Sequence, residues 1–583
     1  MKRFSGAMHV ATTRRQHKDK VYETHLLRRS YREDGKVKNE TLANLSYLPA
    51  ETIQVIRESL AGKHHVVAED CFEIKRSLPH GHVAAVASMA SELKLPALLG
   101  PSCRERDIIY ALIIARAIRP ASKLATSRWF GDTTLGVDLG VVGISTDEIY
   151  AAMDWLYARQ GTIEAQLAKR HLKEGSRVLY DLSSSWMEGT KCPLASYGYS
   201  RDHKRGKTQI EYGLMTDVDG RPIAIEVFSG NTADPSAFVN AVNMTRDRFG
   251  LKELIMVGDR GMITRARIEA MRGLEGTNWI TCLRSPQIRT LVDDEALQLG
   301  LFDETNLAAI THPDYPDERL IACRNPDLAR LRANKREELL VATEKELERI
   351  KASVTERRIK GKEVIALKVG RVLDRHKMAK HFTLEFQDDS FSFVRDTNAI
   401  ATEAALDGIY VIRTSVSQEE LDDAKAVEAY KGLSVVERNF RNLKVIDLDL
   451  RPIYHYSENR VRAHVFCSML ALYVTWHMRE ALAPLMFGDE EIPERHDPVA
   501  PALRSDAAYA KDATKLGADG EVIHSFATLL THLGTLTRNT VEFSQGIQIK
   551  QLSVPTPLQR RVFELIGSPI PITIGGKSTE QKH

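Results

Sequence analysis

The hydrophobic pattern changes its period near residue 175, and this change constrains the fold more than any other feature of the chain. Before it, apolar residues recur every three to four positions, as in 81–95 and 105–117, which predicts helices. After it, short apolar runs bounded by turn residues predict strands. These strands are 177–183, 209–216 and 222–229. The segment 217–220 (DVDG) between the last two is typical of a hairpin turn.

The next elements alternate between helix and strand. We predict a helix over 235–249, a strand over 254–258, a helix over 264–273 and a strand over 278–283. The order β-β-β-α-β-α-β is that of an α/β fold, a mixed sheet flanked by helices.

Residues 286–405 interrupt this order. A charged helix over 327–354 and strand-like alternation at 363–373 and 380–395 predict a β-rich insertion. The core then resumes with a strand over 409–413 and helices over 418–443 and 457–483. We therefore divide the chain into a basic, mostly helical N-terminal region (1–175), two parts of a core (176–285 and 406–485), the insertion (286–405) and a C-terminal extension (486–583).

Charge is nearly balanced over the chain as a whole but not along it. The 583 residues contain 81 Lys and Arg against 78 Asp and Glu, whereas residues 1–50 contain eleven basic and five acidic residues. A second basic segment, 200–207 (SRDHKRGK), contains Arg201, His203, Lys204 and Arg205. Such local patches are compatible with a polyanionic partner, and a solvated surface is the alternative.

The composition excludes several classes of protein. With 43% hydrophobic and 27% charged residues, the chain is neither fibrous nor mainly disordered. Its longest apolar stretches are shorter than the roughly 20 residues that span a bilayer, and no secretory signal is recognised. Six scattered cysteines indicate reduced thiols, and no P-loop for a nucleotide occurs. We expect a soluble, intracellular protein without a membrane partner or a nucleotide cofactor.

Three acidic residues stand out by their positions. Asp181 lies within an apolar strand, Asp259 at the end of another, and Glu437 inside the predicted long helix. A carboxylate in a buried strand requires a partner or a metal. Carboxylates at strand ends beside a helix-borne one can converge on Mg²⁺, and two ions roughly 3.5–4 Å apart suit phosphodiester chemistry. Each acid alone is also explained as a cap, a turn or a solvent-facing residue; their order and context favour a shared site.

The spacing of three residues on the long helix gives a second indication. Seven residues turn a helix by about 700°, so Tyr430, Glu437 and Lys444 are predicted to lie on nearly one face. This combination suits a surface on which the acid meets metal and the other two side chains contact a phosphate backbone.

These motifs resemble those of the DDE transposases of bacterial insertion sequences. The resemblance rests on the strand residue Asp181, the GDRG turn at Asp259, and a Tyr-x2-Arg-x3-Glu-x6-Lys signature. In this sequence the signature reads Tyr430, Leu433, Glu437 and Lys444. Leu433 replaces the arginine, and Arg438 or Arg441 can supply the charge instead. The 178-residue separation between the second aspartate and the glutamate fits the largely β insertion of these enzymes.

The resemblance implies an RNase H-like catalytic domain in which Asp181, Asp259 and Glu437 hold two Mg²⁺ or Mn²⁺ ions. It also implies cleavage of transposon ends, transfer of the resulting 3′-hydroxyl to target DNA, and recognition of terminal inverted repeats by the N-terminal region. A homodimer on paired ends is expected, in the bacterial cytoplasm and on the nucleoid when bound to DNA. The expected DNA contacts are Tyr430, Lys444, Arg438, Arg441, Arg260, Arg201, His203, Lys204 and Arg205.

Three other functions share some of these features. An RNase H-like nuclease that cuts branched DNA or RNA without strand transfer has the same acids. A DNA-binding relative that has lost activity has the same fold, although the intact acids favour an enzyme. A tyrosine recombinase would require a nucleophilic tyrosine served by dispersed Arg and His residues.

Overall fold

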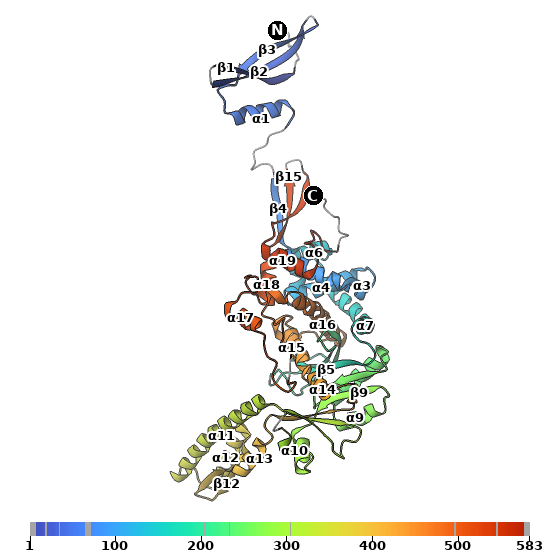
Figure 1. Ribbon diagram of the computed structural model, residues 1–583, viewed down its shortest axis with the longest axis vertical. Helices are drawn as coiled ribbons and strands as arrows, with labels where there is room; N and C mark the ends of the chain where they lie inside the picture. Colours follow the sequence, from blue (N-terminus) through green and yellow to red (C-terminus); the bar gives the residue numbers. More distant parts are fainter. Residues whose placement is uncertain are drawn as a thin grey trace. The chain divides into compact units, whose positions relative to one another are not determined.

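The computed structural model describes residues 7–17, 20–33, 35–63, 72–202, 204–232, 234–302, 305–494, 497–543 and 546–575. The chain forms two compact units. The first contains residues 1–77 and 538–552, and the second contains residues 78–537 and 553–583. Figure 1 shows the helices and strands of both units, with labels on many of them.

The first unit is built mainly from strands. β1 (Met8–His17), β2 (Lys20–Glu33) and β3 (Lys36–Asn44) form an antiparallel sheet, followed by α1 (Ala50–Leu60). A second sheet has the order β16-β15-β4, with β4 at Phe72–Pro79, β15 at Thr537–Phe543 and β16 at Gln548–Leu552. The prediction of a mostly helical N-terminal region is therefore wrong for residues 8–44 and 72–79. The Val, Thr and Tyr residues of this segment favour strands.

An eight-stranded sheet organises the second unit. Its order is β10-β11-β14-β9-β8-β5-β6-β7. The strands are β5 (Ser176–Trp186), β6 (Gln209–Thr216), β7 (Pro222–Ser229), β8 (Leu254–Val257), β9 (Thr277–Cys282), β10 (Leu307–Ile310), β11 (Arg319–Arg324) and β14 (Ile409–Thr414). β5, β8 and β9 are parallel, whereas β6, β7 and β14 run antiparallel to their neighbours.

The strands β7-β6-β5-β8-β9 have the arrangement of the RNase H-like fold. Three consecutive antiparallel strands are followed, on the other side of the first of them, by two parallel strands reached through helices. The predicted mixed α/β sheet flanked by helices is thus confirmed. The strands predicted at 209–216 and 222–229 coincide with β6 and β7.

Helices cover both faces of this sheet. On one face, the Tyr180 hydroxyl donates to the carbonyl of Ala237 in α8 (Asp234–Asn243). On the other, the ring of Tyr212 lies 5.8 Å from that of Phe440 in α15 (Leu433–Arg441). Because neighbouring residues of a strand point to opposite faces, Asp181 lies on the α15 side, opposite Tyr180.

The predicted long helix over 418–443 is interrupted. It consists of α14 (Asp423–Lys431) and α15, separated at Gly432, and α15 passes into a π-helical turn over Asn442–Ile446. Two further helices of the second unit are α9 (Arg265–Arg272) and α16 (Glu458–Ala481). The predicted helices over 264–273 and 457–483 correspond to these two elements.

Helices from both ends of the chain pack around the buried α16. The N-terminal set is α2 (Gly81–Glu92), α3 (Leu95–Leu99), α4 (Arg104–Ile118), α5 (Lys123–Trp129), α6 (Thr134–Asp138) and α7 (Thr146–His171). The C-terminal set is α17 (Asp506–Thr514), α18 (Phe526–Leu533) and α19 (Pro557–Ile566). Apolar side chains of α2, α4, α16, α18 and α19 belong to one continuous core. No helix of the described residues is long and apolar enough to cross a membrane.

The insertion is mainly helical, which corrects the prediction of a β-rich insertion. After α10 (Ser285–Asp293), its strands β10 and β11 extend the main sheet. The rest is α11 (Pro326–Thr355), α12 (Lys362–His376), a hairpin of β12 (Phe382–Phe386) and β13 (Phe391–Arg395), and α13 (Thr397–Ala404), with a separate apolar core. The segment predicted as a strand at 363–373 is helical because its buried residues, Ile365, Val369, Val372 and Leu373, follow the helical period.

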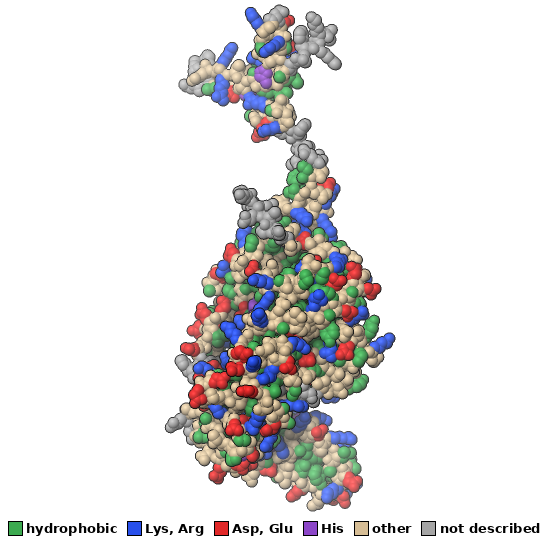
Figure 2. Space-filling model, turned by 90° about the vertical axis from the view of Figure 1, so that its right-hand side faces the viewer, with side chains coloured by type: hydrophobic (Ala, Val, Ile, Leu, Met, Phe, Trp, Pro, Cys, Tyr) green, Lys and Arg blue, Asp and Glu red, His purple; other side chains and the backbone are tan. Residues whose placement is uncertain are grey.

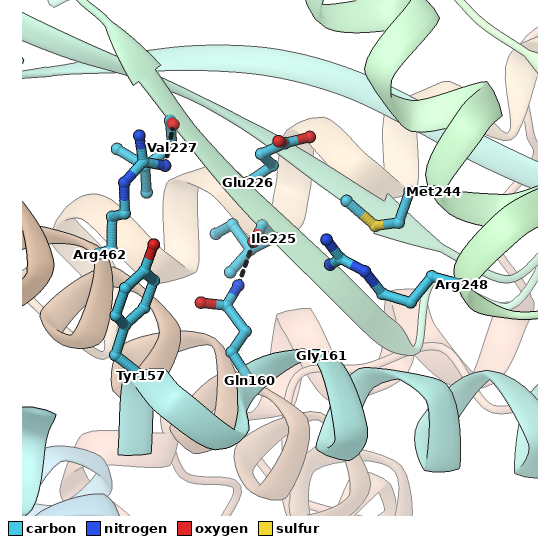
Figure 3. Close-up of a pocket in the computed structure, with 9 residues that line it drawn as sticks. All are labelled: Tyr157, Gln160, Gly161, Ile225, Glu226, Val227, Met244, Arg248 and Arg462. Carbon is cyan, nitrogen blue, oxygen red and sulfur yellow. Dashed lines mark hydrogen bonds between the residues drawn. The ribbon is translucent and has the colours of Figure 1, made fainter. Parts of the chain in front are cut away.

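Side chains of the flanking helices occupy the free edge of β7. Gln160 of α7 donates to the carbonyl of Ile225 over 2.8 Å, and Glu164 accepts from the Ile225 N–H over 3.1 Å. Arg462 of α16 donates to the carbonyl of Val227. Figure 3 shows Gln160 and Arg462 reaching this edge beside a cavity of about 210 Å³. The backbone groups of an edge strand are thus satisfied by side chains in place of another strand.

Candidate active site

The sheet register brings two aspartates to the same level. β5 and β8 are parallel neighbours in which Leu179 pairs with Val257. Asp181 lies two residues after Leu179 in β5, and Asp259 lies two residues after Val257, just beyond the end of β8. The two aspartates are therefore at the same level along the two strands. The sequence predicted this meeting from the position of each acid in its strand.

Asp181 is a nearly buried carboxylate. One oxygen accepts a hydrogen bond from the Leu182 N–H over 2.8 Å. Burial raises the pKa of Asp181 to about 7, the charges of Asp259 and Glu437 add to this rise, and Arg201 opposes it.

The third acid is on an amphipathic helix that packs against β5. The buried residues of α15 are Leu433, Val436, Asn439 and Phe440, whereas Glu437, Arg438 and Arg441 are exposed. This pattern turns the carboxylate of Glu437 away from the core. Arg438 and Arg441 lie beside it on the exposed face and form no ion pair within the described part of the chain.

The three acids line one cavity, of about 400 Å³. Asp181, Asp259 and Glu437 all line it, together with Tyr410, Tyr430, Lys431 and Leu433. Leu433, at the position of the signature's arginine, is buried and contributes an apolar wall. The cavity therefore lacks the arginine that the signature has at this position. Arg438 and Arg441 of α15 do not line the cavity either.

Tyr430 connects α14 to the second aspartate. Its hydroxyl donates to a carboxylate oxygen of Asp259 over 3.4 Å, and the backbone carbonyl of Asp259 accepts from Met262 and Ile263 in the turn that follows. Burial raises the pKa of Tyr430, so the hydroxyl stays protonated and able to donate. This side chain orients Asp259.

Lys431 is a residue of the cavity that the sequence analysis did not identify. Its ammonium group donates to the carbonyls of Pro498, Val499 and Ala500 over 2.6, 2.6 and 2.9 Å. Asn325 of the insertion also donates to the carbonyl of Val499. These bonds attach a loop of the C-terminal part to the wall of the cavity, and no local sequence signal indicated such a distant partner.

Lys444 does not share the exposed face of Glu437, which corrects the predicted alignment. The helix becomes π-helical after Arg441, between Glu437 and Lys444, and Lys444 is buried. Its ammonium group lies 2.9 Å from a carboxylate oxygen of Asp202, which also pairs with Arg451. Burial lowers the pKa of Lys444, and Asp202 opposes this shift. Lys444 thus holds the start of the basic segment 200–207.

The basic segment itself is largely exposed. Lys204 and Arg205 are exposed, and the ammonium group of Lys204 lies 5.5 Å from the ring centre of Trp186. Arg201 is partly buried near Asp181 and pairs with Glu211 over 3.8 Å. Arg260, beside Asp259, is exposed. His203 lies outside the described residues.

The three carboxylates fit a divalent cation in their chemistry. None of them forms an ion pair with a described residue, and hard ions such as Mg²⁺ prefer oxygen ligands. Over the described ranges, however, no three His, Cys, Asp or Glu side chains are close enough to hold an ion as they stand.

An RNase H-like sheet that brings three unpaired carboxylates to one cavity defines an enzyme that acts on phosphodiester bonds. Two family models match the chain: the N-terminal domain of IS1634 family transposases over residues 10–70, and the transposase DDE domain over residues 175–474. The second match covers more than half of the chain. The chain belongs to the DDE transposases of insertion sequences, a family that depends on divalent metal.

Comparisons with individual proteins add little to this assignment. A cryo-EM structure of a piggyBac transposase synaptic complex with hairpin DNA is similar to the chain at 8% identity and a TM-score of 0.34. The similarity covers 86% of this chain and 85% of that chain. A likeness of this size supports no conclusion about this chain. No curated protein matches the sequence.

Proposed function

We propose that this transposase cleaves DNA at the terminal inverted repeats of its insertion sequence and transfers the freed 3′ ends to target DNA. The observation that carries the proposal is the cavity lined by Asp181, Asp259 and Glu437, three carboxylates without an ion-pair partner among the described residues. In the proposal these residues hold two Mg²⁺ or Mn²⁺ ions. When bound, such ions lower the pKa of a water molecule and stabilise charge on phosphate oxygens.

The side chains of this site hold the reacting groups in position. Asp181 is held by the Leu182 N–H, Asp259 by Tyr430, and Glu437 by the buried face of α15. In the first step a water oxygen bonds to phosphorus and the bond to the 3′ oxygen breaks, which leaves a 3′-hydroxyl. In the second step that hydroxyl attacks a target phosphodiester and displaces another 3′ oxygen. Neither step bonds DNA to the protein.

DNA contacts near the cavity are proposed for the exposed cations beside the acids. Arg438 and Arg441 flank Glu437 on α15, and Arg260 follows Asp259. The basic segment, with Arg201, Lys204 and Arg205, is held in place by the ion pair of Lys444 with Asp202. In this proposal Lys444 acts through that segment, and Tyr430 acts through Asp259. Because phosphate contacts dominate, affinity should fall steeply with salt.

Two ends have to be joined, so we infer a homodimer on paired ends in the bacterial cytoplasm. An RNase H-like nuclease without strand transfer is the second candidate, because the same cavity serves hydrolysis alone. An inactive relative is disfavoured by the three intact acids.

The test compares Glu437→Gln with the wild type on a duplex that carries the element's inverted repeat, with Mg²⁺. We expect end binding to persist and cleavage to be lost. Glu428→Gln, on the exposed side of α14 and outside the cavity, is the matched control and should cleave normally. Normal cleavage by Glu437→Gln would refute the assignment. Pre-cleaved ends supplied with a plasmid target then separate the two candidates, because only a transposase joins them.

A further inference from the structure

The β1–β3 sheet of the first unit has two chemically different faces. The register that pairs Thr12 with His25 puts both residues on the face toward α1. Arg57 of α1 donates to the Thr12 hydroxyl and lies 3.3 Å from the ring nitrogen of His25. Because strand residues alternate between faces, every second residue from these positions belongs to the same side, here named the α1 face.

On the α1 face, three cations of the strands are paired with acids. Arg14 pairs with Glu23, and Arg29 with Glu40, each at 2.6 Å. Lys38 pairs with Glu33, also at 2.6 Å. These positive charges are therefore compensated within the sheet.

The opposite face, here named the open face, carries cations without such compensation. Arg15 stands opposite Tyr22, Arg28 opposite His9 and Thr41, and Arg32 opposite Val37. Its other positions with described side chains are neutral: Ala11, Thr13, Thr24, Leu26, Ser30, Asn39 and Asn44. No acid occurs on this face among the described residues of the three strands, and none of its three arginines forms an ion pair there.

The open face is accessible to a partner. Arg15, Arg32 and Tyr22 are exposed, with 58% of Tyr22 accessible to solvent. Figure 2 shows Lys and Arg side chains extending from this part of the chain. Uncompensated arginines beside hydroxyl and amide side chains are the groups that contact phosphates and base edges in DNA.

The dimensions of the sheet suit the major groove. Three strands about 4.8 Å apart span roughly 10 Å between the outer two, and the groove is about 12 Å wide. Arg28 and Arg32 are four residues apart on β2, roughly 13 Å, so they cannot contact one phosphate and instead follow the groove. A bulge at Leu42, where the β2–β3 register shifts, increases the local twist next to Arg28.

We propose that the open face binds duplex DNA in the major groove, through Arg15, Arg28 and Arg32, and that it distinguishes the inverted repeat from other sequences. The inference rests on the proposed function, to which it adds the recognition surface. The neutral side chains between the arginines, such as Asn39 and Thr24, lie where base edges would be read.

The neighbouring residues of the same strands provide a matched control. One full-length variant combines Arg15→Ala, Arg28→Ala and Arg32→Ala; the control combines Arg14→Ala, Arg29→Ala and Lys38→Ala. Each removes three positive charges, but the control also breaks three ion pairs and is the one at greater risk of unfolding. Binding to the inverted-repeat duplex and to an unrelated duplex is measured by fluorescence anisotropy over a salt series.

We expect the open-face variant to bind the repeat at least about tenfold more weakly and to lose its preference over the unrelated duplex. The salt slope should fall by about 0.9 for each phosphate that the variant no longer neutralises. The control should stay within about twofold of the wild type, because its cations are already paired. Wild-type binding by the open-face variant, or an equal loss in the control, would overturn the proposal.

A second pair of variants adds charge without removing any arginine. Thr13→Glu introduces an acid on the open face and should weaken binding, whereas Gln16→Glu on the α1 face should not. Cleavage rates at saturating DNA distinguish a failure of this binding proposal from a failure of the proposed function. At saturating DNA the open-face variant should still cleave. If the wild-type protein never cleaves, the proposed function is refuted, but the result on DNA binding remains valid.

Discussion

The hydroxyl of Tyr430 donates a hydrogen bond to a carboxylate oxygen of Asp259, although the two residues are 171 positions apart in the sequence. One belongs to α14 and the other to the turn after β8, so the bond connects the two halves of the catalytic core across the insertion. A side chain that orients a ligand of a metal changes metal affinity or activity by about 10–100-fold when it is removed.

Tyr430→Phe should therefore lower the cleavage rate by about tenfold and raise the Mg²⁺ concentration required, with end binding unchanged. The measurement is a set of cleavage rates over a Mg²⁺ titration. Tyr410→Phe is the control, because Tyr410 lines the same cavity but, among the described residues, its hydroxyl bonds to none of the three acids. Equal effects of the two substitutions would contradict the orienting role of Tyr430.

Lys431→Met should release the loop at 498–500 from the cavity wall, because three hydrogen bonds from the ammonium group are lost. We expect faster hydrogen exchange in this loop and cleavage lower by roughly tenfold. Lys425→Met on the same helix removes an exposed ammonium group paired with Asp422 and should change neither. Unchanged exchange at 498–500 in the Lys431 variant would show that other contacts hold the loop.

Asp202→Asn should destabilise the protein, because it leaves Lys444 and Arg451 without their buried counter-charge. The expected loss in the free energy of unfolding is about 3 kcal/mol, measured by urea denaturation. Asp219→Asn removes one acid from a largely exposed pair with Arg221 and should cost less than about 1 kcal/mol. A smaller loss at Asp202 than at Asp219 would mean that the buried cluster contributes little.

Glu164 should make stability depend on pH. Burial raises the pKa of this carboxyl to about 7 from 4.5, against the opposing effects of Gln160, Ile225 and Arg248. The folded state then holds its proton more tightly than the unfolded state, so the contribution to stability is complete below pH 4.5 and is lost as pH rises to 7. The expected change is about 1–3 kcal/mol.

Glu164→Gln removes this titration, so the difference in unfolding free energy between wild type and variant should change over that pH interval. Urea denaturation at several pH values measures it. A constant difference would show that the ion pair with Arg248, 2.9 Å long, keeps the carboxylate charged throughout.

The sequence predicts the sheet well because its buried strands are apolar runs with clear ends. The strands at 209–216 and 222–229 match β6 and β7. The pairing of β5 with β8, which brings Asp181 and Asp259 to neighbouring strands, was not part of the prediction. Where polar residues dominate, the pattern fails. In 8–44 both faces of the strands carry polar as well as apolar residues, so the alternation that marks a half-buried strand is missing.

The sequence analysis named the three acids of the cavity but not the residues that surround them. A regular helix puts Tyr430, Glu437 and Lys444 on one face, but the π-helical turn over Asn442–Ile446 changes the direction of Lys444, which is buried. Periodicity assumes an unbroken helix and carries no information about such irregularities. Lys431 was missed because its partners lie 67 to 69 residues away in a loop.

The edge of β7 bears on how copies of this chain can associate. Gln160, Glu164 and Arg462 already satisfy the backbone groups that a second sheet would need in order to continue across this edge. Two molecules therefore cannot merge their sheets into one through β7, and the same obstruction resists uncontrolled strand-by-strand polymerisation. A pairing of protomers on this side of the sheet has to be made by surfaces other than the β7 edge.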